Sequence, residues 1–324
     1  YESIWREPVK FKYKDYDIIS MSFPSSGGIL LGQMMKAIEK FDLSKVPHNS
    51  AEYIQLLTEI ERRAFADRSD LMGDPDFMSL PVYEFMDEEY IEERMKSFSW
   101  EEATPSSEIK PGEVIFNESD ETTHFSIIDK SGNAVSVTTT LNNSFGSKVY
   151  VENSGFFLNN EMDDFSSKPG YPNFFGVLGS EANSIQPGKR MLSAMTPTIV
   201  LKNNKPKLIL GSPGGPSIIT SVFQTILNVI EYDMDVNEAV SAPRFHHQWY
   251  PDLIVMEDNV YSYEVDSVLK SKNYLIVKLP IEEDTLGVYK RSNIGAVDAI
   301  LIDDFRNVSG GADSRREHYT SSVE

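Results

Sequence analysis

The sequence contains no cysteine, and this absence excludes disulfide bonds, cysteine-ligated zinc and thiol nucleophiles. Only five histidines occur among the 324 residues, and none shows the His-Glu-x-x-His spacing of a zinc-binding helix. No apolar run reaches the roughly 18 residues that a membrane-spanning helix needs. We therefore predict no metal site, no cofactor and no membrane span in this sequence.

Basic residues are also scarce, since 30 Lys and Arg face 50 Asp and Glu, for a formal net charge of −20. Nucleic acids and anionic membranes are bound by positive patches, so this balance argues against either as a partner. With 40% hydrophobic and 25% charged residues, the composition is typical of a packed globular protein. The first residue is Tyr1 and no signal peptide is visible, so we expect the sequence to be part of a longer gene product.

Helical and strand patterns occur in separate blocks along the chain, which favours a layered α+β architecture over a doubly wound sheet. Asn49 and Ser50 can cap the second predicted helix, and the loop GSPGGPS at 211–217 separates a strand from a helix. The predicted elements are a strand at 16–24, helices at 29–41, 50–68 and 87–98, an exposed linker at 101–121, a hairpin at 122–141, strands at 196–202 and 205–211, helices at 218–232 and 236–242, then strand, helix and strand at 252–257, 262–272 and 274–280, a strand at 296–303 and a polar tail.

The acidic linker runs directly into the hairpin at NESDETTHF, where the strand begins with Thr122 and Thr123. A threonine at a chain terminus can use its own α-amine, of reference pKa about 7.7–8.0, as the base that activates its hydroxyl. A cut between Glu121 and Thr122 would create that terminus. On residue types alone, two threonines entering a strand also fit ordinary β-propensity.

Several longer motifs decide between these alternatives. TTHFSIID at 122–129, GSPGGPSIITSVFQ at 211–224, APRFHHQW at 242–249 and, earlier, FADRSDLMGDPDF at 65–77 resemble the γ-glutamyltranspeptidase family. They occur in the family's order and spacing, and the resemblance covers essentially the whole chain. It implies an N-terminal-nucleophile hydrolase with a four-layer αββα sandwich, made as a precursor that cuts itself. Residues 1–121 would be the C-terminal part of the large subunit and 122–324 the small catalytic subunit, together one intertwined domain and a heterodimer after cleavage.

The resemblance assigns roles to four catalytic positions. Thr122 matches the nucleophile and Thr140 the residue whose hydroxyl hydrogen-bonds to it. Gly214 and Gly215 match the oxyanion-hole glycines, which agrees with the need for unobstructed backbone N–H groups in such a loop. A phosphate-binding loop would end in Lys-Ser or Lys-Thr, and this sequence has no such ending there.

The resemblance also implies how substrate is bound. Asn142, Glu161 and Asp164 match residues that hold the α-amine of a glutamyl group, where two carboxylates give charge-assisted bonds. Ser193 is expected to meet the α-carboxylate. The family usually has a second serine at the next position, but Ala194 stands here, and the family's carboxylate-binding arginine comes from a first half that these 324 residues do not include.

Three further features have expected roles. The loop SSKPGYPNFFGVLG at 166–179 resembles the lid of some family members, with Phe175 where those lids carry a tyrosine. An aromatic in such a loop also often packs locally. We interpret His246 and His247 as structural, and His124 as a strand residue that helps to orient the new terminus.

The resemblance therefore implies a self-processing γ-glutamyl hydrolase or transpeptidase that cleaves the γ-amide of glutathione and related compounds through a γ-glutamyl ester of Thr122. Its partners would be a γ-glutamyl donor and a water, amino-acid or dipeptide acceptor. Alternatives are an acylase, a poly-γ-glutamate depolymerase or an uncut, non-catalytic member of the family. The compartment is not given by the sequence, and only the resemblance suggests an extracytoplasmic one.

Overall fold

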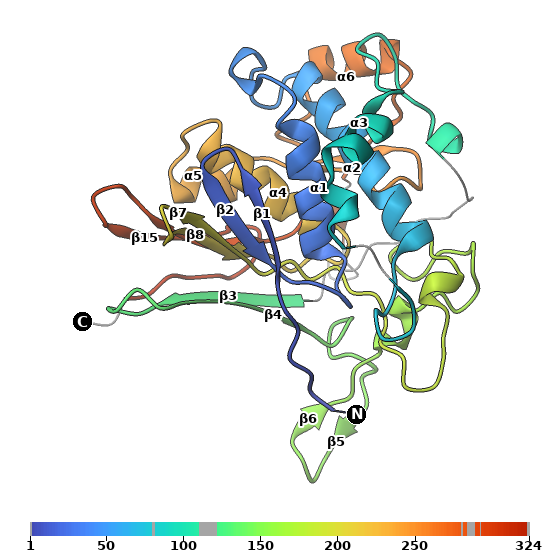
Figure 1. Ribbon diagram of the computed structural model, residues 1–324, viewed down its shortest axis with the longest axis vertical. Coiled ribbons are helices and arrows are strands. Elements are labelled where there is room, and N and C mark those ends of the chain that lie inside the picture. The colour runs from blue at the N-terminus through green and yellow to red at the C-terminus, as the bar shows by residue number, and fades with distance from the viewer. Residues whose placement is uncertain are drawn as a thin grey trace.

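A six-stranded antiparallel sheet lies at the centre of the protein, in the strand order β1-β2-β7-β8-β14-β15 (Figure 1). The structure is a computed structural model that describes residues 2–79, 82–109, 122–279, 281–283, 289–291 and 293–322. The sheet strands are β1 (Val9–Tyr13), β2 (Tyr16–Ser20), β7 (Thr198–Lys202), β8 (Lys205–Gly211), β14 (Asp298–Ile302) and β15 (Val308–Ala312). The molecule therefore has the mixed helix and strand content that the sequence predicts.

The remaining elements surround this sheet. The helices are α1 (Gly27–Ile38), α2 (Ala51–Leu71), α3 (Glu88–Met95), α4 (Ser217–Ile230), α5 (Val236–Ser241) and α6 (Tyr263–Ser271). Outside the central sheet lie the hairpins β3 (Thr122–Ile128) with β4 (Ala134–Thr140), β5 (Tyr150–Val151) with β6 (Phe156–Phe157), and β12 (Ile281–Glu283) with β13 (Tyr289–Arg291), and a small sheet of β9 (Phe245–His246), β10 (Ile254–Met256) and β11 (Ile276–Lys278). Short 3₁₀ turns are η1 (Leu43–Lys45), η2 (Glu84–Met86), η3 (Ser106–Ile109), η4 (Glu161–Asp164) and η5 (Glu181–Asn183).

Helices α1 and α4 pack on one face of the central sheet, and α2 packs on α1 (Figure 1). Strand β1 alternates buried and exposed residues, with Val9 and Phe11 inside and the lysine between them outside. Gly28 of α1 allows close approach, because a Cβ there would lie 2.7 Å from the Cγ1 of Val9. Ser50 caps α2 by accepting a hydrogen bond from the backbone N–H of Tyr53, which confirms the predicted helix start. No helix in the described ranges is long and apolar enough to cross a membrane.

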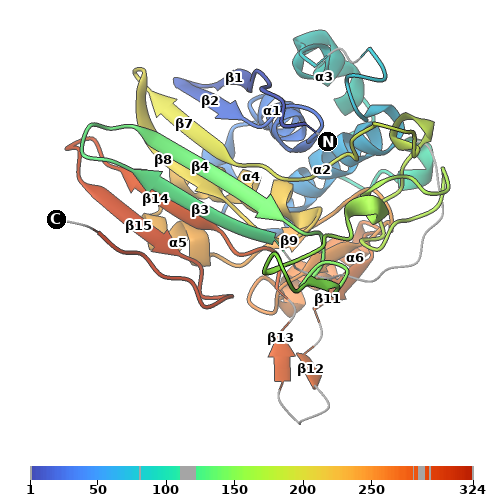
Figure 2. The same ribbon diagram turned by 90° about the horizontal axis from the view of Figure 1, so that it is seen from below.

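The β3–β4 hairpin covers the opposite face of the sheet, over β8 and β14 (Figure 2). Ser136 of β4 ties the two together, because its Oγ donates to the carbonyl of Leu210 and accepts from the N–H of Thr198. The inner face of β3 carries polar residues, whereas Phe125 and Ile127 on its outer face are 44% and 53% exposed. The hairpin is thus fixed on a rigid sheet, with Thr122 at the end of its first strand.

The predicted exposed linker at 101–121 is only partly confirmed in its described part, where Glu101, Glu102, Pro105, Ser107 and Glu108 are exposed but Thr104 and Ser106 are buried. Ser106 is fully buried, its Oγ donates to the carbonyl of Trp249, and its backbone N–H donates to Asp252. The buried guanidinium of Arg62 also donates to Ser106. These long-range contacts override the Pro- and Ser-rich composition that predicts a loop in solvent. The remainder of the linker, 110–121, lies outside the described residues.

Candidate active site

Thr122 and Thr140 face each other across the hairpin as directly paired residues of β3 and β4. The Oγ1 of Thr122 lies 3.5 Å from the Oγ1 of Thr140, to which it donates. Thr140 Oγ1 also accepts a 2.8 Å hydrogen bond from the backbone N–H of Asn142, which has a left-handed backbone with φ +76. The turn after β4 thus fixes the hydroxyl that contacts Thr122. Glu121, the other side of the expected cleavage site, lies outside the described residues.

A small pocket of about 30 Å³ opens next to Thr122. Six of the eight residues predicted for the site line it: Thr122, Thr140, Asn142, Asp164, Ser193 and Gly215. The other two are adjacent, since Gly214 precedes Gly215 and Glu161 lies in the same 3₁₀ turn as Asp164. A larger cavity of about 340 Å³, lined by Arg62, Asp252 and Tyr274, contains none of the predicted residues.

Asp164 provides an enclosed carboxyl group at one side of the pocket. Burial raises the pKa of Asp164 to about 7, the positive charge of Arg68 acts in the opposite direction, and the carboxylates of Glu161 and Asp163 add to the rise. Burial also raises the pKa of Glu161. Two carboxyl groups are therefore held where a cation that entered the pocket would stabilise their charged forms.

Arg68 is a pocket residue that the sequence analysis did not single out, although it lies inside the quoted motif FADRSDLMGDPDF. It comes from α2, burial lowers its pKa to about 10, and its Nε donates to Ser26 at 2.9 Å. No ion pair within 4.0 Å joins Arg68 to Asp164 or to another carboxylate of the described chain. A buried guanidinium and a partly buried carboxyl group thus share one pocket without a direct ion pair.

Ser193 is positioned by the segment that precedes α1. Its backbone exchanges hydrogen bonds with that segment, since its N–H donates to the carbonyl of Pro24 and its carbonyl accepts from Ser26. The N–H of Met195 donates to Ser193 Oγ at 3.1 Å, which leaves the hydroxyl proton available for a ligand. Ala194 also lines the pocket and has no polar group to offer there.

Gly214 and Gly215 form the turn between β8 and α4, with φ values of +131 and +50. Both are left-handed conformations that L side chains rarely adopt, so only glycine fits without strain. Neither amide N–H donates a hydrogen bond to another residue in the described part of the chain. Two unused backbone donors near a nucleophile are what an oxyanion hole requires.

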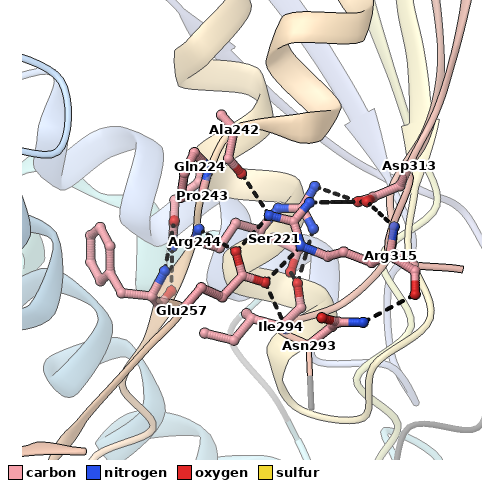
Figure 3. A network of polar contacts seen from close by, with 12 residues as sticks. Ser221, Gln224, Ala242, Pro243, Arg244, Glu257, Asn293, Ile294, Asp313 and Arg315 are labelled. Carbon is pink, nitrogen blue, oxygen red and sulfur yellow. Dashed lines mark hydrogen bonds and ion pairs between the residues drawn. The ribbon is translucent and has the colours of Figure 1, made fainter. Parts of the chain in front are cut away.

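A buried network of ion pairs surrounds the backbone of Ile294 (Figure 3). Arg244 donates to Asp313 at 2.8 Å, and Arg315 pairs with both Asp313 and Glu257 at 2.9 and 2.6 Å. Arg244 and Glu257 also bond the carbonyl and the N–H of Ile294. Because every charge has a partner, the network fixes the backbone of this segment at depth.

The segment held by this network supports the glycine turn. Gly295 follows directly, and a Cβ on Gly214 would lie 2.9 Å from its Cα. Arg316, which follows Arg315 of the network, donates to the backbone carbonyl of Thr122 at 3.0 Å. The chain after β15 therefore contacts both the predicted nucleophile and the support of the predicted oxyanion hole.

The three histidines with expected structural roles are all buried. The ring of His124 packs on Gly211 and bonds Thr138 and Ser126, and burial lowers its pKa to about 3. Burial likewise lowers the pKa values of His246 and His247 to about 4. None of the three lines the pocket. Phe175 does, and it is only 5% exposed, so the loop at 166–179 forms part of the pocket wall, which fits both the lid and the local-packing interpretation.

The chain is similar in sequence and fold to known proteins. The family model described as Gamma-glutamyltranspeptidase matches residues 1–323. The Glutathione hydrolase proenzyme of Escherichia coli (strain K12) is 46% identical over 272 residues, which are 84% of this chain and 47% of that protein. A gamma-glutamyltranspeptidase from Pseudomonas nitroreducens, solved in complex with L-DON, is 44% identical with a TM-score of 0.56, over 62% of this chain and 100% of that one.

A cephalosporin acylase from Bacillus halodurans resembles the fold of the whole chain. Its TM-score is 0.81 over 100% of this chain and 54% of that one, and at 22% identity the likeness concerns the fold alone. The chain spans about half the length of the curated relatives that it matches.

Proposed function

Because the chain belongs to the γ-glutamyltranspeptidase family, we propose that it forms the catalytic part of a self-processing γ-glutamyl hydrolase and transpeptidase. Its donors would be glutathione and related γ-glutamyl amides. The observation that carries this proposal is the pairing of Thr122 with Thr140 in a pocket that also contains Asp164, Ser193 and Gly215. The curated relatives at 46% identity are named glutathione hydrolase proenzymes.

The proposed reaction begins with cleavage of the Glu121–Thr122 bond. The hydroxyl of Thr122 attacks the preceding carbonyl, the C–N bond breaks and an ester forms, and water hydrolyses this ester to release the Glu121 carboxyl group and restore the hydroxyl. The freed α-amine of Thr122 then takes the hydroxyl proton, and the oxygen attacks the γ-carbonyl of the donor. The N–H groups of Gly214 and Gly215 stabilise the oxyanion. The C–N bond breaks, the leaving amine receives the proton, and water or an acceptor amine then cleaves the ester and returns a proton to Thr122.

The charges of the pocket fit the head group of an α-amino acid. We assign Asp164, Glu161 and Asn142 to the α-ammonium, and Ser193 to the α-carboxylate. Arg68 lies in the same pocket, where it adds positive charge that favours the carboxylate. A ligand with both charges satisfies both ends, whereas a ligand with one leaves a buried group unpaired, which costs about 1–3 kcal/mol.

The finer architecture also belongs to this proposal. We propose the four-layer αββα sandwich, with residues 1–121 and 122–324 as the parts of two subunits in one intertwined domain. The outer face of β3 supports a further layer, because Phe125 and Ile127 there are large, apolar and about half exposed. A covering helical layer would bury them. An extracytoplasmic location is proposed on family resemblance alone.

Two variants test the proposed function. Thr122→Ala should leave the full-length protein as one uncut species by intact mass and abolish release of nitroaniline from a γ-glutamyl anilide. Thr123→Ala is the matched control, because this neighbouring strand threonine is exposed and points to the other face. This variant should be cut before Thr122, so that the N-terminal sequence of its new subunit begins Thr-Ala-His, and it should remain active. A Thr122→Ala protein that is still cut and active would falsify the proposal.

An acylase or a poly-γ-glutamate depolymerase is the alternative within this fold. The acidic groups around the pocket argue against glutaryl substrates, which lack an α-ammonium, and the Phe175 loop would obstruct a polymer. Turnover of glutathione, a glutaryl amide and poly-γ-glutamate in parallel would rank the three. A protein that stays uncut after long incubation would instead point to a non-catalytic family member.

A further inference from the structure

A chain of side-chain hydrogen bonds joins helix α4 to the loop that closes the pocket. The hydroxyl of Thr220 lies 2.8 Å from Nδ1 of His246. Nε2 of His246 lies 2.9 Å from Oε1 of Gln248. The amide Nε2 of Gln248 then donates to the backbone carbonyl of Phe175 at 3.1 Å. All three donor residues are at least 97% buried, so water does not compete for these bonds.

The directions of the last two bonds follow from the final member. A carbonyl oxygen only accepts, so Gln248 must present its NH₂ group to Phe175 and its Oε1 to His246, and His246 therefore carries a proton on Nε2. Burial lowers the pKa of His246 to about 4, so the ring is neutral and its bare Nδ1 accepts from Thr220, whose hydroxyl also lies 3.2 Å from the carbonyl of Ser217.

Phe175 is the residue through which this chain reaches the pocket. Its ring packs against Gly215, where a Cβ would lie 2.9 Å from Cδ1 of the ring. With the ring in this position the pocket measures about 30 Å³, space for about two or three water molecules. Phe175 therefore forms part of the wall of this narrow pocket, and its position controls access to Thr122.

The attachments of this loop show why Gln248 matters. Asn173 accepts hydrogen bonds from the backbone of Phe175 and Val177 within the loop, and Asp163, eleven residues before Phe174, accepts from the N–H of Phe174. Both tethers are local in sequence, since Asp163 lies in η4 just before the loop. Gln248 is 73 residues away and belongs to the buried scaffold next to β9.

We propose that Gln248, oriented by His246 and Thr220, is a latch that holds Phe175 closed over the pocket and thereby sets the balance between hydrolysis and transfer. Thr220, His246 and Gln248 are positioning residues, because none of them lines the pocket. The inference rests on the proposed function. In both outcomes the ester bond of Thr122 breaks and the proton of the attacking water or amine returns to its oxygen, so only access differs between them.

The test compares near-isosteric variants in the full-length, self-processed protein. Gln248→Met removes the bond to Phe175, and Thr220→Val removes the bond that orients His246. The control is Thr225→Val, a buried threonine of the same helix whose hydroxyl bonds only the carbonyl of Ser221 in that helix. The measured quantity is the ratio of transfer to hydrolysis, with a γ-glutamyl anilide as donor and a dipeptide as acceptor.

We expect the ratio to fall about two- to tenfold in Gln248→Met, the range that loss of one hydrogen bond gives, and by less in Thr220→Val. Thr225→Val should match the unmodified protein. Limited proteolysis should cut the loop at 166–179 faster in the two latch variants. In a Phe175→Ala background, Gln248→Met should change the ratio little, because the shield is already absent.

An unchanged ratio and unchanged loop proteolysis in a folded Gln248→Met protein would overturn the latch. So would an equal change in Thr225→Val. If Gln248→Met does not fold, Thr220→Val gives the same readings with a milder perturbation. Failure of the proposed function is distinguishable, because a protein without Thr122-dependent turnover would still report latch strength through loop proteolysis.

Discussion

Replacing Asp164 by asparagine tests the recognition of the substrate α-ammonium directly. The two side chains have the same shape, but asparagine lacks the charge that would pair with an ammonium group in an enclosed site. A hydrogen bond to a charged group contributes about 1.5–3 kcal/mol. We therefore expect kcat/KM for a γ-glutamyl anilide to fall roughly 10- to 150-fold, whereas a glutaryl anilide, identical except for the missing ammonium, should lose little or gain.

The pH dependence gives a second and sharper reading. Asp164 has a pKa of about 7 because it is buried beside Glu161 and Asp163, with Arg68 opposing the rise. Below that pH it is protonated and neutral, so binding of a cation should weaken, about tenfold in kcat/KM for each pH unit. In Asp164→Asn this limb should disappear.

The α-amine of Thr122 would also titrate in this region, since its reference pKa is about 7.7–8.0. Its effect is common to both substrates and cancels in the ratio of their kcat/KM values. The assay therefore measures the ratio of kcat/KM for the γ-glutamyl anilide to kcat/KM for the glutaryl anilide from about pH 5.5 to about pH 9. This range covers the pKa values of Asp164 and of the α-amine of Thr122. Equal losses for the two anilides, or a ratio that does not change with pH in the unmodified protein, would refute the role of Asp164.

Asp164→Asn should weaken substrate binding but increase the thermal stability of the free protein above pH 7. The pKa of Asp164 is higher in the folded protein than the ordinary 3.8, so the folded state binds the proton more tightly, and stability falls as pH rises from about 4 to 7. Asparagine avoids that loss. Without substrate, we expect Asp164→Asn to melt higher than the unmodified protein above pH 7 and to lose this advantage near pH 4, as measured by thermal denaturation at both values.

Three further substitutions probe the scaffold. Thr140→Val removes the hydroxyl next to Thr122, the proposed nucleophile, and should slow both self-cleavage and turnover about 2- to 12-fold, as followed by intact mass and anilide hydrolysis; unchanged rates would contradict its contact with Thr122. Gly211→Ala places a Cβ against the His124 ring and should cost about 1–3 kcal/mol, visible as a lower Tm. Arg244→Met leaves Asp313 buried without one of its cations and should lower the free energy of unfolding in denaturant by about 3–5 kcal/mol. A smaller decrease than that of Gly211→Ala would contradict this.

Local sequence patterns predict most of the elements, and the exceptions have physical reasons. Strand β1 was not predicted, although Val9, Phe11 and Tyr13 alternate with lysines as a half-buried strand should. That signal was present. Strand β15 carries the sequence VSGGA, which has low strand propensity and reads as a polar tail. It pairs because β14 offers an open edge, and such pairing depends on tertiary structure.

The site residues likewise fall into those that local motifs predict and those that depend on tertiary structure. Motifs that are contiguous in sequence, such as the threonines that open β3 and the glycine turn before α4, predict their part of the pocket. Arg68 and Gln248 were not assigned roles, because each acts on a residue far away in the chain, Arg68 beside Asp164 and Gln248 on the carbonyl of Phe175. Helix α2 is buried along nearly its whole length, and a buried arginine such as Arg68 needs a charged or polar partner. This need is a signal that the sequence offers.

The separation of charges in the pocket explains why the site must be built from so many segments. Arg68 and Asp164 would neutralise each other if their side chains were free, and a neutralised pair would no longer attract either end of a zwitterion. Ser26 holds Arg68 on one side, while the 3₁₀ turn that carries Asp164 is fixed by Asn183, whose side chain donates to the Asp164 carbonyl. The two groups are thus held by separate supports, and in the proposed function an α-amino acid head group would pair with both. Preorganisation of this kind requires a rigid scaffold, which the central sheet and the helices packed on it provide.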